Sequence, residues 1–249
     1  ASVLKKKKNH INTSSPVLDT CGTGGDGKHT FNISSLSALI AAACGAKVAK
    51  HGNRAVSSKS GSADFYAELG INYNLSPAQS EELLEKEGFV FMFAPLFHGA
   101  MRHAGPVRAE LGVKTIMNLL GPLVNPADAE YQIIGVYSKE LCPIMARAAK
   151  MTGVKRAMVV HSDDGLDEIS PAAPARVFMI DEDGKETDCI FKPEEAGFSG
   201  FRTEDLAGGS GSENAAIARR LLEGSGPAAV RAACVLNAGA ALAAANLAG

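Results

Sequence analysis

The chain has 249 residues, a length that fits one large domain or one domain with a small appendage. Hydrophobic residues make up 46% and charged residues 21%, which excludes wholesale disorder. Because 25 Lys and Arg residues oppose 27 Asp and Glu residues, the formal net charge is −2, which argues against a polyanion-binding surface over the whole protein but is compatible with a local phosphate pocket.

Strand and helix patterns alternate along the first part of the chain. In chain order we predict a strand at 17–19, a helix at 36–44, a strand at 47–49, helices at 61–69 and 77–87, and a strand at 89–93. Asn32, Ser34 or Ser35 is available as the N-cap of the first helix, and Ser62 as the N-cap of the second. A glycine-rich loop separates the first strand from the first helix.

The alternation resumes at residue 131. We predict a strand at 131–137, a helix at 140–152, a strand at 156–161, a hairpin of 176–180 and 188–191 across the turn at 183–184, and a small-residue helix at 227–248. This pattern predicts an α/β domain built on a mostly parallel sheet flanked by helices. Residues 95–128 fit it poorly because prolines break them into short helices and loops, and such a long irregular insert is usually functional.

The cysteines and the apolar segments indicate the compartment. Five cysteines without any C-x-x-C pair favour a reduced cytoplasm over a disulfide framework or a zinc site. The Ala-rich segment 227–248 contains Arg231, Asn237 and Asn246, so we interpret it as a buried helix rather than a membrane span. No apolar segment follows the lysine run 5–8, which argues against a signal peptide and favours a solvated helix end. We therefore expect a cytoplasmic protein without membrane or nucleic-acid partners.

The glycine-rich segment 21–29 (CGTGGDGKH) is the richest local motif. Gly22, Gly24 and Gly27 have the spacing of a dinucleotide-binding loop, but no helix opens inside the loop and the next strand ends without an acidic residue. A P-loop also fails, because His29 stands where the magnesium-binding hydroxyl is needed. Glycines still let backbone N–H groups approach an anion, so a phosphate loop and a tight turn without ligand both stay open.

Two further polar loops follow predicted strands. The segment 50–64 (KHGNRAVSSKSGSAD) holds cations, an amide and hydroxyls, and its place after a strand favours a phosphate-rich ligand over a plain solvated loop. The segment 163–168 (DDGLDE) offers adjacent carboxylates that suit Mg²⁺ if a phosphate site lies nearby, and otherwise form an acidic turn. Arg108 could grip a planar carboxylate or pair with its neighbour Glu110, and the residues alone leave both open.

Several motifs gain specificity when they are taken together and in order. They are 19–26 (DTCGTGGD), 32–35 (NISS), 50–54 (KHGNR), 61–64 (GSAD), 93–98 (FAPLFH), 108–112 (RAELG), 118–126 (NLLGPLVNP) and 167–168 (DE). This series covers most of residues 17–246 and resembles the anthranilate phosphoribosyltransferase family.

The resemblance implies a fold and a domain organisation. The fold is that of the nucleoside phosphorylase class III and anthranilate phosphoribosyltransferase group, a large α/β domain with a small helical domain. We expect one phosphoribosyltransferase α/β domain over residues 1–249, with 95–128 as an insert that contributes to the small helical domain. We also expect the family's N-terminal helices, which make its usual homodimer contact, to be absent and the C-terminus to stop early, which leaves dimerisation of this chain open.

The resemblance also implies a reaction. The amine of anthranilate attacks C1 of phosphoribosyl pyrophosphate (PRPP) and pyrophosphate leaves, a step of tryptophan biosynthesis. Mg²⁺ and Lys50 would stabilise the charge on the departing pyrophosphate, so that an oxocarbenium-like ribosyl centre can form. The aromatic amine is already neutral at pH 7 and needs no strong base, so positioning by Arg108 would supply much of the rest. The alternatives are a pyrimidine nucleoside phosphorylase and a non-catalytic relative that binds nucleic acid.

The family's functional residues carry over by position. The PRPP-binding residues would be Gly22, Gly25, Asp26, Thr30, Asn32, Ser34, Ser35, Lys50, Asn53, Ser57, Ser58 and Ser62. Anthranilate would contact Gly22, Asn53 and Arg108, and the cofactor Mg²⁺ would be held by Ser34, Asp167 and Glu168. Lys50 and Arg108 are the expected catalytic residues.

Overall fold

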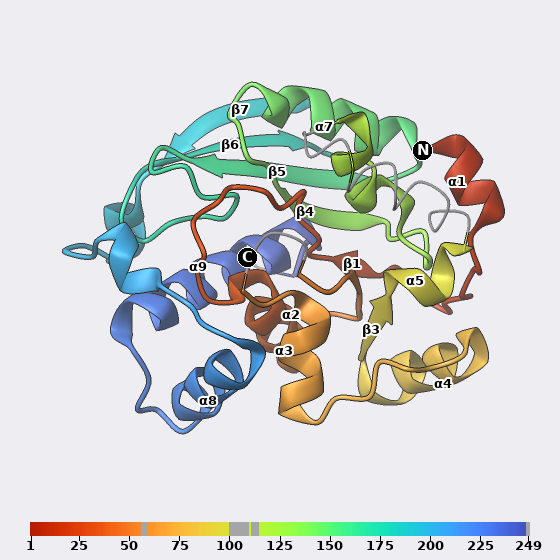
Figure 1. Ribbon diagram of the computed structural model, residues 1–249. Coiled ribbons are helices and arrows are strands. Elements are labelled where there is room, and N and C mark those ends of the chain that lie inside the picture. Colours follow the sequence, from red (N-terminus) through yellow and green to blue (C-terminus); the bar gives the residue numbers. More distant parts are fainter. Residues whose placement is uncertain (56–58, 100–109, 111–114, 248–249) are drawn as a thin grey trace.

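One sheet forms the centre of the part of the chain that the computed structural model describes, which is residues 1–55, 59–99, 110 and 115–247. Its strands are β1 (Leu18–Asp19), β2 (Val48–Gly52), β3 (Phe89–Phe93), β4 (Tyr131–Gly135), β5 (Arg156–Ser162), β6 (Ala175–Ile180) and β7 (Glu186–Phe191). They lie in the order β3-β2-β1-β4-β5-β6-β7 (Figure 1). Neighbours from β3 to β5 are parallel, and β6 and β7 form an antiparallel edge. The predicted fold class is confirmed.

Helices cover both faces of this sheet (Figure 1). The α-helices are α1 (Ser2–Lys7), α2 (Ile33–Ala43), α3 (Ser62–Leu69), α4 (Pro77–Glu87), α5 (Ala94–Phe97), α7 (Leu141–Met151), α8 (Gly211–Leu222) and α9 (Ala228–Ala244). Short 3₁₀ helices lie at Ile116–Asn118, Gly121–Val124, Pro193–Ala196 and Thr203–Leu206. The described parts of 95–128 therefore consist of short helices and loops, as the prolines predict.

Helix α3 corrects one detail of the sequence prediction. Its N-cap is Gly61 and not Ser62, which is the first helical residue. The Oδ2 atom of Asp64 accepts hydrogen bonds from the backbone N–H groups of Gly61 (2.9 Å) and Ala55 (3.1 Å). An acidic side chain in the first turn thus satisfies donors that a capping hydroxyl would otherwise serve. An atom at the Cβ position of Gly61 would overlap the backbone of Ala55, which explains the glycine.

Alternation along each strand divides the core between the two faces. On one face, α2 and α9 pack on Leu18, Ile133 and Met158, and small residues such as Ala38 and Ala241 let these two helices lie close to the sheet. On the other face, α7 packs on the residues of β4 and β5 that alternate in sequence with those of the first face. The small-residue helix predicted at 227–248 is therefore a buried core helix, as expected.

The strand order creates a switch point between β1 and β4. From β1 the chain runs through α2 to β2 on one side, and from β4 it runs through α7 to β5 on the other side. In open α/β sheets, the loops that leave the carboxyl ends of two such strands diverge and open a crevice for a ligand. The glycine loop follows β1 at this point, so the fold places it where a site is expected.

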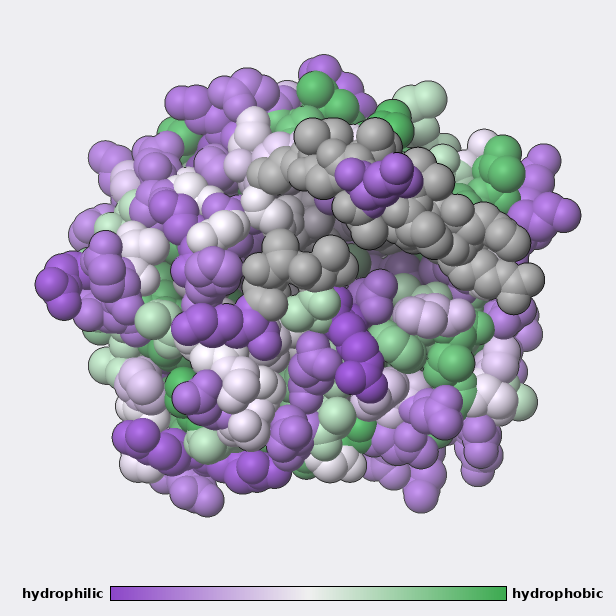
Figure 2. Space-filling view, viewed as in Figure 1, coloured by the Kyte–Doolittle hydropathy of each residue, from purple (hydrophilic) through white to green (hydrophobic). Residues whose placement is uncertain are grey.

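Among the described residues, no helix is long and apolar enough to cross a membrane. On the face shown in Figure 2, hydrophilic residues predominate and hydrophobic residues are scattered among them. Large exposed apolar side chains such as Val3, Ile116 and Met151 come from different elements of the chain.

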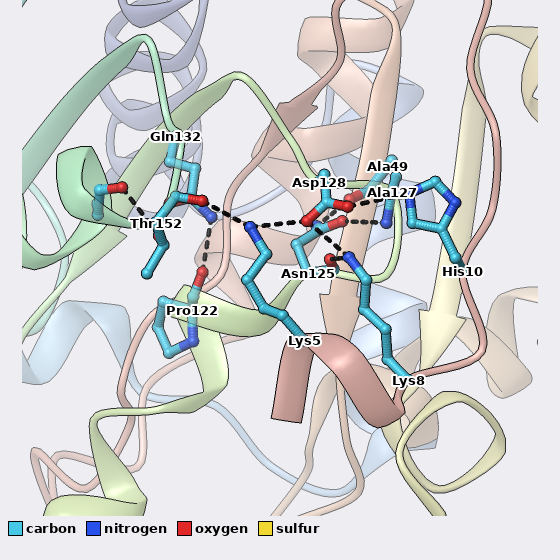
Figure 3. A network of polar contacts seen from close by, with 11 residues as sticks. Lys5, Lys8, His10, Ala49, Pro122, Asn125, Ala127, Asp128, Gln132 and Thr152 are labelled. Carbon is cyan, nitrogen blue, oxygen red and sulfur yellow. Dashed lines mark hydrogen bonds and ion pairs between the residues drawn. The ribbon is translucent and has the colours of Figure 1, made fainter. Parts of the chain in front are cut away.

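The lysine run 5–8 is only partly the solvated helix end that its sequence predicts. The Nζ atoms of Lys5 and Lys8 both lie 2.7 Å from Asp128 Oδ1, and His10 Nε2 lies 2.9 Å from Asp128 Oδ2 (Figure 3). Lys8, whose side chain is 2% exposed, also donates to the carbonyl of Asn125. The cluster therefore ties the N-terminal segment to the loop before β4.

We expect Asp128→Asn to lower the free energy of unfolding by about 1–2 kcal/mol at pH 7, because it removes the carboxylate from beside the buried Lys8. Burial raises the pKa of Asp128, but the hydrogen bonds from Lys5 and Lys8 outweigh it and lower the pKa overall. The carboxylate's contribution is therefore present above the usual Asp pKa and lost as the pH falls through the lowered value. Denaturant melts of both proteins at several pH values test this, with the exposed turn variant Asp183→Asn as control; a difference that persists at pH 2 contradicts it.

Candidate active site

The glycine loop after β1 is held against the end of β4. Thr23 donates to the carbonyl of Gly135 from its backbone N–H (2.8 Å) and from its hydroxyl (3.2 Å). A Cβ atom on Gly22 would lie 3.3 Å from both the Gly135 carbonyl oxygen and Asp167 Oδ2, so glycine allows the close approach here. The loop then turns through left-handed conformations at Gly24 (φ 62°), Gly25 (φ 82°) and Gly27 (φ 73°).

The predicted ligand residues around the start of α2 divide into accessible and buried ones. Thr30 forms an isolated bridge with Ala207. Ser34 is half-buried, and its backbone N–H donates to Glu168 Oε1 (3.2 Å). Ser35 is only 2% exposed, and its carbonyl accepts the Tyr66 hydroxyl (2.8 Å).

Asn32 is the N-cap of α2, but its side chain bonds across the fold. Its Oδ1 atom accepts from the Ser60 hydroxyl (3.0 Å) and from Asn214 Nδ2 (2.8 Å), and its Nδ2 atom donates to the Ser60 carbonyl (3.2 Å). Asn214 is buried on α8, a helix that the sequence prediction missed. This amide therefore joins three segments beside the glycine loop.

Lys50 extends from the middle of β2 into the same region. Its side chain is buried, and Nζ donates to the carbonyl (2.8 Å) and hydroxyl (2.9 Å) of Thr20 and lies 3.4 Å from the Ser34 hydroxyl. Asp19, at the end of β1, is fully buried and accepts the His51 N–H (3.1 Å). Burial raises the pKa of Asp19 to about 6, although the charge of Lys50 and the hydrogen bonds oppose this rise.

Two carboxyl groups of the loop after β5, Asp167 and Glu168, lie beside the glycine loop and its Asp26. Burial raises the pKa of Asp167, and the nearby Asp26 raises it further by its negative charge and by a side-chain hydrogen bond. Burial also raises the pKa of Glu168, which the charge of Asp167 reinforces and that of Lys50 opposes. Clustered carboxylates with raised pKa values repel one another and favour a bound cation.

The loop that follows β2 is braced by its own side chains. The carbonyl of Asn53 accepts the Ser62 hydroxyl (3.3 Å), and the Asn53 side chain accepts the N–H of Arg54 (2.8 Å). Arg54 donates to the Tyr73 hydroxyl (2.6 Å) and lies near Asp64. The predicted ligand residues Ser57, Ser58 and Arg108 lie outside the described residues.

The glycine loop, α2, β4, the loop after β5 and α9 together line a small cavity of about 10 Å³ at the switch point. It is lined by Thr20, Gly22, Ser34, Ser37, Ile133, Gly135, Glu168 and Asn237. The lining residues from the glycine loop, α2 and the loop after β5 lie in or beside motifs that the sequence singles out, whereas Asn237 on α9 is not predicted as part of a site. The one sequence signal that could have pointed to Asn237 is that it is an amide within an alanine-rich helix.

The side chains present fit Mg²⁺. Ser34, Asp167 and Glu168 offer only hard oxygen donors, and the two carboxyls have raised pKa values that a divalent cation would counter. Within the described ranges, no three His, Cys, Asp or Glu side chains form a complete metal-binding group. Mg²⁺ is usually held by one or two carboxylates, keeps several waters and binds substrate phosphates through its remaining positions.

A glycine loop and clustered carboxylates at the switch point of a mostly parallel sheet are typical of α/β proteins that bind phosphorylated ligands. The model of the glycosyl transferase family, a/b domain, matches residues 14–249. An anthranilate phosphoribosyltransferase from Desulfosudis oleivorans is 50% identical over 247 residues, which cover 99% of this chain and 73% of the relative. The chain belongs to the anthranilate phosphoribosyltransferase family.

Solved structures of that family have the same fold. The anthranilate phosphoribosyltransferase from Thermus thermophilus has a TM-score of 0.91 and 45% identity, with 98% of this chain and 73% of that chain covered. The enzyme from Saccharomyces cerevisiae, in complex with PRPP and Mg, has a TM-score of 0.88 and 30% identity, with 100% and 70% covered.

Proposed function

We propose that this chain transfers the phosphoribosyl group of PRPP to the amine of anthranilate, as its family name describes, and so serves tryptophan biosynthesis. The bond between ribose C1 and the pyrophosphate oxygen breaks, a bond between C1 and the amine nitrogen forms, and the amine releases a proton. The observation that carries the proposal is the convergence of the glycine loop, Ser34, Lys50 and the 167–168 carboxyls at the switch point.

The donor would lie along the glycine loop and the start of α2. Backbone N–H groups there are suited to phosphate oxygens, and the N-terminus of an 11-residue helix adds a favourable dipole. The contacts proposed from sequence are Gly22, Gly25, Asp26, Thr30, Asn32, Ser34, Ser35, Lys50, Asn53, Ser57, Ser58 and Ser62. Because Ser35 is buried, we expect its contribution to come through the position of α2.

Mg²⁺ would be held by Ser34, Asp167 and Glu168, and when bound it would neutralise charge on the pyrophosphate. Lys50 would supply a second positive charge from a fixed position, because three hydrogen bonds hold its Nζ atom before substrate arrives. The acceptor would lie near Gly22, Asn53 and Arg108. The homodimer that the resemblance implies can be tested by sedimentation of the purified chain.

The alternative functions are less well supported. A pyrimidine nucleoside phosphorylase has no need for the paired carboxyls at 167–168, and a nucleic-acid binder has no need for a buried Lys50 beside them. The relative from Desulfosudis oleivorans that is 50% identical is also an anthranilate phosphoribosyltransferase by name.

The deciding experiment follows the fluorescence of anthranilate after PRPP and Mg²⁺ are added to the purified chain. We expect the fluorescence to fall with Mg²⁺ and to stay constant with a chelator. Phosphorolysis of thymidine is assayed in parallel for the nucleoside phosphorylase alternative. Binding of single-stranded DNA at low salt is assayed for the nucleic-acid-binding alternative. Phosphorolysis of thymidine, or DNA binding without loss of anthranilate, would favour an alternative.

We expect Asp167→Asn to stabilise the metal-free protein by about 1 kcal/mol at pH 8, because it removes one of the mutually repelling carboxylates. Since its pKa is raised in the fold, Asp167 lowers stability as the pH rises above the usual Asp value, and the gain should vanish at low pH. Mg²⁺ with pyrophosphate should raise the Tm of the wild type but not of the variant. Thermal melts test this, with the exposed Asp163→Asn as control, and a variant that is no more stable than wild type at pH 8 contradicts it.

A further inference from the structure

The proposed metal ligands come from two distant parts of the chain. Ser34 stands in the first turn of α2, whereas Asp167 and Glu168 lie in the loop after β5. Among the described residues, one hydrogen bond that involves a proposed ligand side chain joins these two parts directly. The Ser34 N–H donates it to Glu168 Oε1 (3.2 Å). A cation that binds Glu168 competes for that oxygen, so the spacing of the two parts needs another support.

The side chain of Asn237, on α9, is hydrogen-bonded to the backbone of the loop after β5 that carries Asp167 and Glu168, here called the carboxylate loop. Its Oδ1 atom accepts the N–H of Ile169 (2.9 Å), and its Nδ2 atom donates to the carbonyl of the same residue (2.8 Å). Nδ2 also donates to the carbonyl of Ala233, one turn earlier in α9 (2.8 Å). Asn237 is 2% exposed, and Ile169 directly follows Glu168, so this two-point bond fixes the backbone beside a proposed ligand.

The same helix is bonded to α2. The buried hydroxyl of Ser37, one turn after Ser34, donates to the carbonyl of Cys234 (3.0 Å). Cys234 lies one turn before Asn237 on α9. One helix therefore holds the serine side and the carboxylate side at a fixed spacing, through bonds to groups that are not themselves ligands.

We infer that Asn237 is a positioning residue for the magnesium site: by its paired bonds to Ile169 it holds the 167–168 carboxyls at the distance from Ser34 that Mg²⁺ requires. The inference rests on the proposed function, since it assumes that these side chains bind Mg²⁺. Hydrogen bonds that orient metal ligands from behind typically change metal affinity by about 10–100-fold when they are removed.

The test measures binding rather than turnover. PRPP binding to wild type, Asn237→Ala, Asn237→Ser and Val230→Ala is followed by calorimetry over a series of Mg²⁺ concentrations. Val230 is buried on the same helix, two turns away, so its variant is destabilised without a change at the carboxylate loop. Asn237→Ser keeps a polar group but cannot make both bonds to Ile169, and it carries the test if Asn237→Ala does not fold.

We expect the Mg²⁺ concentration for half-maximal PRPP binding to rise at least about tenfold in the Asn237 variants, with PRPP affinity at saturating Mg²⁺ unchanged, and to stay at the wild-type value in Val230→Ala. If the Asn237 variants melt at lower temperature but keep the wild-type Mg²⁺ dependence of PRPP binding, the inference is overturned, because the role of Asn237 is then structural only. Wild type without Mg²⁺-dependent PRPP binding would instead overturn the proposed function.

Discussion

Replacement of Lys50 by Met should lower kcat by about 10²–10³-fold, the loss typical when one preorganised transition-state donor is removed. Lys50 is buried in the middle of β2, and Thr20 and Ser34 hold its Nζ atom in place. Met keeps most of the side-chain volume but carries no charge, so pyrophosphate would leave without this stabilisation. The initial rate of anthranilate consumption at saturating PRPP and Mg²⁺ measures the effect.

Lys47→Met is the matched control for this prediction. Lys47 lies just before the same strand, and its Nζ atom pairs at the surface with Glu85 (2.8 Å) and with the Ser14 hydroxyl (3.3 Å). Because exposed ion pairs contribute little, we expect its kcat to stay within about twofold of wild type. If Lys50→Met folds normally and keeps a rate within about tenfold of wild type, Lys50 has no catalytic role of the kind proposed.

Replacement of Gly135 by Ala should lower the free energy of unfolding by about 3 kcal/mol or more, the upper range for overpacking. Gly135 ends β4, and a Cβ atom there would overlap the backbone carbonyl oxygen of Asp167. Backbone cannot rotate aside as a flexible side chain can, so the carboxylate loop or the strand must move. A denaturant melt measures the loss, and PRPP binding should weaken in whatever fraction stays folded.

Gly239→Ala gives the opposite expectation. Gly239 lies in α9, and among the described residues outside its own helix backbone no atom comes within 4 Å of its Cβ position. Ala is favoured over Gly inside a helix by about 1 kcal/mol, so this variant should be slightly more stable than wild type. If both variants behave alike, the clash at Gly135 is relieved at little cost and the close packing of β4 on the carboxylate loop is not essential.

Much of the fold could be predicted because its signals are local. The strand at 89–93 is an uninterrupted apolar run, and α4 spans the predicted residues Pro77–Glu87, with Ser76 as its N-cap. Helix α8 was missed because the Gly- and Ser-rich residues 208–212 obscured its start, although Ser210 and Glu213 form a capping box there. Strand β2 extends to Gly52 because it pairs with the whole of β3, a tertiary effect that its own residues do not display.

The candidate site shows the same division between local and tertiary signals. Glycines and clustered carboxylates are evident in sequence because their chemistry depends on residue type and spacing. The bonds from Asn214 to Asn32 and from Asn237 to Ile169 join residues 182 and 68 positions apart, and they depend on how the helices pack. The burial of Lys8 beside Asp128 arises in the same way, over a separation that no local pattern spans.

The shortness of β1 has a consequence for how the protein folds. This strand has two residues, yet Leu18 pairs with Val48 on one side and with Tyr131 on the other. So short a strand gains little from its own hydrogen bonds, so it is stable only when β2 and β4 are both beside it. Pairing with β4 closes a loop of more than one hundred residues, and such long-range closure is slow. The glycine loop leaves β1 directly, so during refolding the capacity to bind PRPP should return only with the slowest step that unites both halves of the chain.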